Sequence, residues 1–385
     1  MSINQLSSHF GQPEGVSTIE DCRPISIDVQ TFREEPLLGI DFSGVGVIKR
    51  TNQDKRDAYI RKQMQETGHS AVHVIRSDTA SNQYFEGKVG IFSLGCSDLI
   101  DSNASGTITM LQPTAAVFDE KTDTVIIGAA DQIHRLDRNL GKIETFPSPW
   151  FARIHTIDIV PGTRQGLVTS ASYDMFHIVD LDTGELISEF SIWDRFPCYN
   201  SDGQLVLRAG ITPDFTITTE NEDNIFRAPA DGLGLHHSRV PLSINSAIME
   251  DNKILFTAFR TGTLYEYDLN SGGINPILTG MGSPHAISRI DNGYMVTDTI
   301  GENVIYLNND LSVRSVLNFT NLGGKKEGLE GERWLQSATP MPDGLIAVVD
   351  SPRSSIHIVD PVNSLRRSIP FAQNWAMQFF LPLTN

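Results

Sequence analysis

Cysteine is scarce in this sequence of 385 residues. The three present, Cys22, Cys96 and Cys198, lie far apart and form no CxxC pair. A scattered, odd set of cysteines excludes a disulfide framework and a thiolate zinc site. The N-terminal residues lack the basic stretch and apolar run of a secretory signal, and no stretch approaches eighteen consecutive apolar residues. We therefore expect a cytoplasmic protein that does not enter a membrane.

Positive charge is also in deficit. Lys and Arg together number 30 against 47 Asp and Glu, which gives a formal charge of −17. Such a field repels phosphate backbones and anionic lipid headgroups, so nucleic acid and membranes are excluded as partners. A hydrophobic fraction of 39% in a chain of this length is enough to bury a large core, which excludes a disordered protein.

Helical periodicity is rare along the chain, whereas short β-branched and aromatic runs separated by Gly, Asp, Asn and Pro recur throughout. One strand type, an aliphatic residue or Phe followed by an aromatic residue or His, occurs seven times at intervals of 39 to 51 residues. This interval is typical of one four-stranded propeller blade. The seven occurrences are Ile91–Phe92, Ile133–Asp137, Phe176–Asp180, Ile225–Phe226, Leu264–Asp268, Ile305–Tyr306 and Ile356–Asp360.

The repeat predicts an all-β fold, a seven-bladed β-propeller, with a six-bladed ring as the alternative. The first unit lacks an inner strand and the C-terminus carries a spare one, Trp375–Phe380, so we expect the last strand to complete the first blade and close the ring. Residues 37–385 then form a single propeller domain behind an irregular leader, residues 1–36. One helix is predicted over residues 52–66, as an insertion near the closure.

Two segments carry a resemblance to a known group of propellers. Phe176–Glu185 is similar to the strand and turn of YVTN-type blades, and Pro284–Gly293 resembles the inner-strand opening of streptogramin-lyase-type blades. The chain thus resembles the YVTN, NHL and streptogramin-lyase group over about residues 70 to 380. The resemblance implies a propeller fold and, through the lyases, a histidine base and a divalent cation near the axis. The resemblance implies this role only for His285, because its Pro-His-Ala-Ile context is the part of the sequence that resembles the lyases.

Ten histidines are present, and three of them are expected to be structural. His134, His177 and His357 occupy the place in the repeat that Phe or Tyr fills in other blades, so they should pack between neighbouring sheets.

The inner strands suggest a different role for other polar residues. In five blades, the residue five positions before the last apolar residue of the inner strand is His, Asn or Gln. In a sixth blade, the same position lies beside Gln112. Equivalent positions on inner strands face a common channel, where they form a ring. The alternative is a wet channel mouth whose polar residues only hold waters. The members of the ring are His155, Asn245, His285, Gln336, Asn374 and Gln112.

Further candidates surround this ring. His155 and His285 are the candidate acid–base groups, because imidazole titrates near neutrality. Amide oxygens and a nearby carboxylate would suit Ca²⁺ or Mg²⁺, which makes Asp298, Asn245 and His285 a candidate cation set. Trp334 ends a Gly-rich loop, residues 323–334, that could cover the channel. No organic cofactor is predicted, because no nucleotide-binding or nucleophile motif is present.

Two functions from different classes follow. The first is an enzyme acting on a small molecule by elimination, isomerisation or hydrolysis, in which one imidazole moves a proton and the amides orient the substrate. The second is a non-catalytic scaffold that grips a protein partner through the helix at residues 52–66 or the loop at 323–334. Substitution of both histidines separates them, because only the enzyme would lose turnover.

Overall fold

The structure is a computed structural model of the chain that describes residues 16–67, 86–148, 150–192, 195–196, 198–199, 205–209, 216–219, 226–227 and 242–383. Residues 1–15 of the predicted leader lie outside the described residues. The fold is all-β, with two α-helices among the described residues, α2 (Ile19–Cys22) and α3 (Gln53–Thr67). Neither is long and apolar enough to cross a membrane.

Six sheets of antiparallel strands form the body of the molecule, each ordered from an inner to an outer strand. The first three are β6 (Pro113–Asp119), β7 (Thr124–Ala129), β8 (Gln132–Asp137) and β9 (Lys142–Pro147); β10 (Ile154–Ile159), β11 (Gln165–Ser170), β12 (Met175–Asp180) and β13 (Leu186–Ser191); and β18 (Ile244–Glu250), β19 (Lys253–Ala258), β20 (Thr263–Asp268) and β21 (Ile274–Leu278). The other three are β22 (Pro284–Ile290), β23 (Gly293–Asp298), β24 (Asn303–Leu307) and β25 (Val313–Asn318); β26 (Leu335–Pro340), β27 (Ile346–Asp350), β28 (Ser355–Asp360) and β29 (Leu365–Pro370); and β30 (Ala376–Leu383), β3 (Ser43–Arg50), β4 (Glu86–Ser93) and β5 (Ala104–Leu111).

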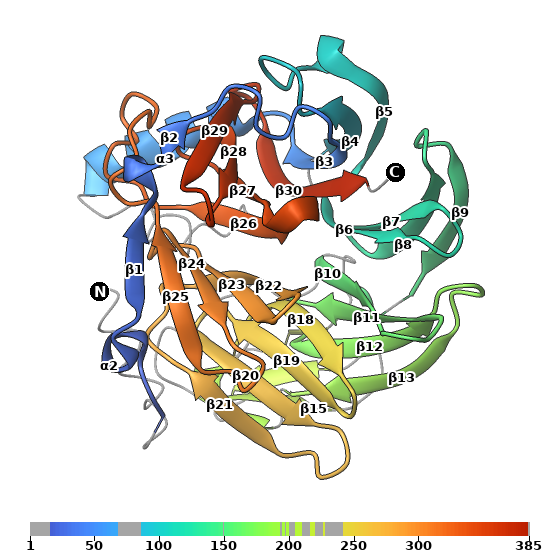
Figure 1. Cartoon of the computed structure of the whole chain (residues 1–385). Coiled ribbons are helices and arrows are strands. Elements are labelled where there is room, and N and C mark those ends of the chain that lie inside the picture. Colours follow the sequence, from blue (N-terminus) through green and yellow to red (C-terminus); the bar gives the residue numbers. More distant parts are fainter. Residues whose placement is uncertain are drawn as a thin grey trace.

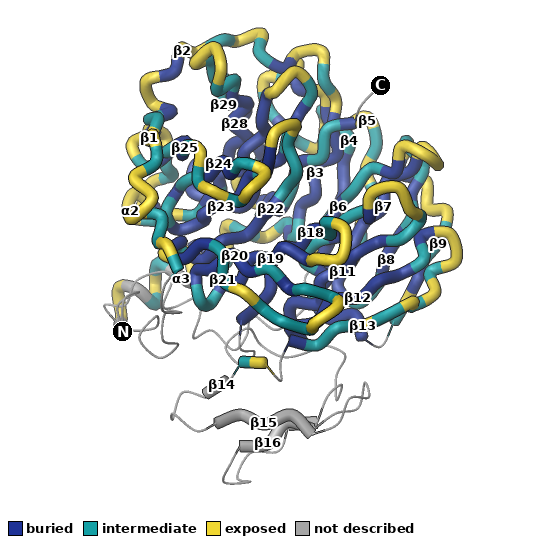
Figure 2. The backbone as a smooth tube through the Cα atoms, turned by 60° about the horizontal axis from the view of Figure 1, so that its bottom comes forward, coloured by how far each residue is buried: buried dark blue, intermediate teal, exposed yellow. Residues whose placement is uncertain are grey.

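The six sheets are the blades of a closed propeller. The inner strands contact one another in the cyclic order β6, β10, β18, β22, β26, β30 and back to β6. Figure 1 shows the blades around a common centre with these strands nearest to it. Along the blades the strands are mostly buried, and exposed residues gather in the turns and at the outer edges (Figure 2).

The prediction of seven blades is wrong, and the six-bladed alternative is the fold observed. The repeat that is not a blade is the fourth, counted at Ile225–Phe226. Phe226 lies in a separate sheet of short strands, namely β14 (Cys198–Tyr199), β15 (Leu205–Ala209), β16 (Thr216–Thr219) and β17 (Phe226–Arg227). This sheet does not separate its sequence neighbours, because β18 packs directly against β10 and β11. The strand pattern identified a four-stranded unit correctly but could not show that the unit stands outside the ring.

The closure of the ring is confirmed. The C-terminal strand β30 is the inner strand of the blade that contains β3, and Val45 and Val47 pair with Leu381 and Phe379. Closure by strands from both ends of the chain pairs the inner edge of β3, which would otherwise be exposed. The predicted helix is also present, since α3 lies between β3 and β4 of this blade.

A segment within the predicted leader adds strands to the outer edges of two blades. β1 (Ile25–Asp28) pairs in parallel with β25, and β2 (Arg33–Glu34) pairs in parallel with β29. Between them, Val29 and Phe32 are buried in the apolar cluster that joins these two neighbouring blades. The segment therefore covers two outer edges and contributes to the core.

The histidines expected to be structural lie in the third strand of their blades. His134 in β8 bonds through Nδ1 to Thr145 Oγ1 at 3.0 Å, and His357 in β28 bonds to Ser368 Oγ at 2.9 Å. His177 in β12 is fully buried against the edge of Phe151, and both of its ring nitrogens lack a hydrogen-bond partner. These rings pack between sheets and lie away from the inner strands.

His177 makes the folded state sensitive to acid. Burial lowers its pKa from 6.5 to about 3, so between these values the unfolded chain binds a proton that the folded chain does not. The free energy of unfolding should therefore decrease as the pH falls from 6.5 towards 3, by up to about 1.4 kcal/mol per pH unit for this group. We expect His177→Phe to remove that contribution and to stabilise the protein by about 1 kcal/mol at pH 7, because no ring nitrogen is then left unpaired.

Denaturant unfolding at pH 7 and pH 5 measures this effect. The matched change His134→Phe deletes a hydrogen bond to Thr145 and should not stabilise the protein. An unchanged difference between the two pH values in His177→Phe would contradict the prediction.

Candidate functional site

The candidate site is built where the inner strands begin. In four blades the residue just before the inner strand is not glycine yet has a positive φ: Gln112, Arg153, Ser243 and Ser283, at 41° to 63°. The pairing register of the same strands shifts at their second residue, which marks a β-bulge. A bulge re-aims the side chain of the extra residue, so the sequence at each strand start places one polar residue in an equivalent position.

These bulged positions form the ring at the start of the channel. Four of them are residues predicted for the ring, and the blades of β6 and β30 contribute other residues. The six residues are Thr114, His155, Asn245, His285, Gln336 and Gln378.

His155 and His285 meet although their strands are not neighbours. β18 lies between β10 and β22 in the ring, yet the two imidazole centroids are 5.5 Å apart at an interplanar angle of 52°. Side chains from blades two places apart reach each other only if both project towards the axis. Asn245 lies on the strand between them, with its Nδ2 donating to the Pro284 carbonyl at 3.4 Å and its backbone bonded to the His155 ring.

Hydrogen bonds fix the tautomer of His285. Its Nδ1 faces Thr299 Oγ1 at 2.7 Å and the Ser283 carbonyl oxygen at 3.3 Å. A carbonyl only accepts, so the Ser283 contact favours the tautomer that carries the proton on Nδ1 and leaves the lone pair on Nε2. Among the described residues, no hydrogen bond to Nε2 of His285 is found. His285 thus presents a hydrogen-bond acceptor to the site.

Both imidazoles are neutral at neutral pH. Burial, with a smaller contribution from the positive charge of Lys49, lowers the pKa of His285 to about 3. Burial also holds the pKa of His155 well below its usual range, with contributions from His285, Lys49 and Arg153. A neutral imidazole can accept a proton, which is the state that a general base requires.

Aromatic side chains enclose one face of His285. The indole of Trp334 and the ring of Phe259 meet the imidazole edge to face, with centroids at 5.5 Å and 5.2 Å. Trp334 Nε1 donates to Gln336 Oε1 at 2.7 Å, so the loop that ends at Trp334 is tied to the ring position of β26. Trp334 therefore lies within the candidate site, next to the predicted base.

Two of the predicted ring residues lie elsewhere. Gln112 is buried two residues before the bulged position, which Thr114 occupies in β6. Asn374 is exposed before β30, where its Nδ2 donates to the Thr51 carbonyl at 3.2 Å, and Gln378 takes the ring position. The counting rule failed because these strands place their bulge at a different distance from the following turn. The pairing register supplies the correct equivalence.

Asp298 does not face the imidazoles. It is buried, and its Oδ1 accepts from the backbone nitrogens of Gly282 at 2.6 Å and Gly301 at 3.2 Å. Among the described residues, no group of three or more His, Cys, Asp or Glu side chains could hold a metal ion. With Lys49 and Arg153 acting on the imidazoles, the set Asp298, Asn245 and His285 does not fit a divalent cation.

An ion-pair cluster lies further along the same three inner strands. Arg289 of β22 contacts Asp158 Oδ1 of β10 at 2.6 Å and Glu250 Oε1 of β18 at 2.5 Å. Asp158 also accepts from the Met249 backbone nitrogen at 3.0 Å. Asp158, which strand alternation turns to the opposite face from His155, therefore links strands and takes no part in the candidate site.

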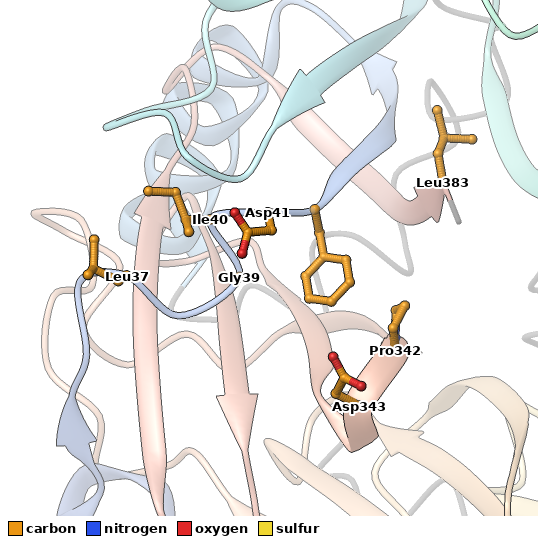
Figure 3. Close-up of a pocket in the computed structure, with 8 residues that line it drawn as sticks. Leu37, Gly39, Ile40, Asp41, Pro342, Asp343 and Leu383 are labelled. Carbon is orange, nitrogen blue, oxygen red and sulfur yellow. The ribbon is translucent and has the colours of Figure 1, made fainter. Parts of the chain in front are cut away.

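A separate pocket opens near the other ends of the inner strands. It has a volume of about 490 Å³ and is lined by residues that include Leu37, Phe42, Pro342 and Leu383. Figure 3 shows it between the segment before β3, the turn after β26 and the end of β30. None of the predicted site residues lines this pocket, so it is not the candidate site.

The solved structures that superpose on this chain are distant from it in sequence. No protein-family model matches the chain, and no curated protein matches its sequence. A protein of unknown function from Bacteroides caccae superposes with a TM-score of 0.49 at 14% identity, covering 77% of this chain and 95% of that one. A streptogramin B lyase gives 0.44 at 13% identity, with 78% and 96% covered, and the WD40 repeats of RRP9 give 0.43 at 12%, with 68% and 81% covered.

Proposed function

We propose that the chain is an enzyme that transforms a small molecule at the start of the central channel, by elimination, isomerisation or hydrolysis. The observation that carries the proposal is the pair formed by His155 and His285, with imidazole centroids 5.5 Å apart from two non-adjacent blades. In this proposal the Nε2 atom of His285 takes the proton, and His155 is the second acid–base group.

The roles of the other residues follow from their contacts. The hydrogen bonds of Nδ1 to Thr299 and Ser283 keep the lone pair of His285 on Nε2. The side chains of Asn245 and Gln336, at equivalent positions, orient a polar substrate, while Trp334 and Phe259 exclude water from one side. The proposed chemistry is proton transfer by protein groups, and no step requires a metal or an organic cofactor.

The His pair can be tested without knowing the substrate. The purified protein and the double variant His155→Gln and His285→Gln are incubated with a small-molecule extract, and mass spectrometry follows which components are consumed. We expect the native protein to deplete a component that the variant converts at least about 100-fold more slowly, because the variant has no base. The control His134→Gln changes an imidazole outside the site and should retain turnover. Equal depletion by the native protein and the double variant would contradict the proposal.

The alternative proposal is a scaffold that binds a protein partner. Its support is that α3 and the loop at residues 323–334 lie together, since Lys326 Nζ is 3.6 Å from Asp57 Oδ2. Tyr59 of α3 is also exposed. In this proposal, partner capture survives the double histidine substitution and is lost in Tyr59→Ser.

A further inference from the structure

The loop that ends at Trp334 is fixed to the blade of β22 by a buried ion pair. Lys325 Nζ lies 3.1 Å from Glu302 Oε1, and the side chains of these two residues are 12% and 0% exposed. The same ammonium donates to the Glu332 carbonyl at 2.6 Å. Lys325 therefore joins the start of the loop to its end, two residues before Trp334, and holds both on one buried carboxylate.

Glu302 belongs to the turn between β23 and β24, which also holds the candidate base. Thr299 in this turn contacts His285 Nδ1 through its Oγ1 at 2.7 Å. The Thr299 carbonyl accepts from the backbone nitrogens of Leu335 at 3.1 Å and of Glu302 at 3.4 Å. One turn thus contacts the imidazole, the residue that follows Trp334 and the ammonium that holds the loop.

Two adjacent lysines attach this loop to different parts of the molecule. Lys325 contacts Glu302, a carboxylate that also has an ion pair with Arg353 at 3.0 Å, so Lys325 is not its only counter-charge. Lys326 points to α3 instead, where its Nζ lies 3.6 Å from Asp57 Oδ2. The contact of Lys325 with the turn beside the imidazole therefore has a use other than neutralising a buried charge.

We propose that Lys325 and Glu302 are positioning residues of the candidate site, which hold the indole of Trp334 against His285. This inference rests on the proposed function, because Trp334 then forms the wall that a substrate meets beside the base. The indole and imidazole centroids are 5.5 Å apart, and the place of the indole follows from where the loop sets the Trp334 backbone. A shift of the loop end would move the indole away from the imidazole and admit water to the base.

NMR of the indole and imidazole signals tests the proposal without a substrate. Lys325→Met should increase the hydrogen-exchange rate of the Trp334 indole N–H, which donates to Gln336, by at least about 10-fold, because the loop then opens more often. It should also move the ring signals of His285 towards those measured in Trp334→Leu, which lacks the indole. The matched control Lys326→Met removes the neighbouring ammonium, which contacts α3, and should leave both readouts unchanged.

A second variant separates positioning of the indole from support of the fold. Glu302→Gln keeps the shape of the side chain and leaves Arg353 its ion pair with Asp350 at 2.7 Å, and it should change both readouts as Lys325→Met does. If Lys325→Met does not fold, Lys325→Gln, which retains a donor for the Glu332 carbonyl, serves the same test.

Native-like indole exchange or unchanged His285 signals in the folded Lys325 variant would overturn the proposal, even if its thermal stability falls. Such a result would mean that the ion pair only supports the fold. Neither readout requires turnover, so failure of this inference and failure of the proposed enzyme activity are distinguishable.

Discussion

A chain that ends at Trp375 is expected not to fold. The deletion removes β30, the inner strand of the closing blade, and leaves the backbone of β3 without its partner. It also removes Met377 and Phe380, which are at most 1% exposed, from an apolar cluster shared with the neighbouring blade. Losing a large buried side chain costs about 2–5 kcal/mol, so losing several together exceeds the stability of an ordinary domain.

Circular dichroism and thermal unfolding of the truncated chain measure this effect. We expect no cooperative transition and strong self-association, because the edge of β3 becomes unpaired and the faces of β26 and β6 lose the strand that packs between them. A synthetic peptide of residues 374–385 should restore a cooperative transition, while a scrambled peptide of the same composition should not. A truncated chain that unfolds cooperatively within a few degrees of the full chain would show that the ring does not depend on this strand.

Arg353→Met is expected to cost about 3 kcal/mol of stability, because it removes the cation that two buried carboxylates share, although Glu302 keeps its ion pair with Lys325 at 3.1 Å. Arg353 Nη1 lies 2.7 Å from Asp350 Oδ2 and 3.0 Å from Glu302 Oε1, and all three side chains are at most 2% exposed. Its Nε donates to the Leu322 carbonyl at 3.0 Å. The guanidinium thus joins the blade of β22 to the blade of β26 and holds the start of the loop that ends at Trp334.

Thermal and denaturant unfolding test the role of this residue, and the midpoint of thermal unfolding should fall by about 10 °C. Arg314→Met is the matched control, since Arg314 is exposed over the Tyr306 ring and its loss should change stability by less than about 0.5 kcal/mol. Adding Asp350→Asn to Arg353→Met should recover part of the loss, because one of the two buried charges that Arg353 neutralised is then removed. A loss below about 1 kcal/mol in Arg353→Met would show that the cluster does not join the blades.

Much of the fold could be predicted because each blade repeats the same physical solution. The aromatic or His position in the third strand, the turns between strands and the spare C-terminal strand identified the blades and the closure of the ring. The number of blades was not predictable in this way. A four-stranded unit such as β14–β17 has the strand pattern of a blade, and only packing between sheets, here β18 against β10, decides which units belong to the ring.

The candidate site was predictable where the strand pattern is regular. His155, Asn245, His285 and Gln336 are each the second residue of their strand, so a fixed count found them. The same count did not identify Thr114 and Gln378, because the position of a bulge depends on pairing with the next strand. The sequence did not predict that Lys49 acts on the imidazoles, because Lys49 lies on the second strand of the closing blade. Its place relative to the imidazoles depends on contacts between residues far apart in the sequence. The adjacent Lys49 and Arg50 at a strand end were the available signal.

The central claim is that His155 and His285 share one buried site in which both rings are neutral. Nitrogen-15 NMR of the imidazoles between pH 8 and pH 5 tests it most directly. We expect neither ring to titrate in this range, His285 to carry its proton on Nδ1, and the signals of each ring to shift when the other is replaced by Gln. Two rings that titrate independently near pH 6.5, each unaffected by loss of the other, would contradict the account.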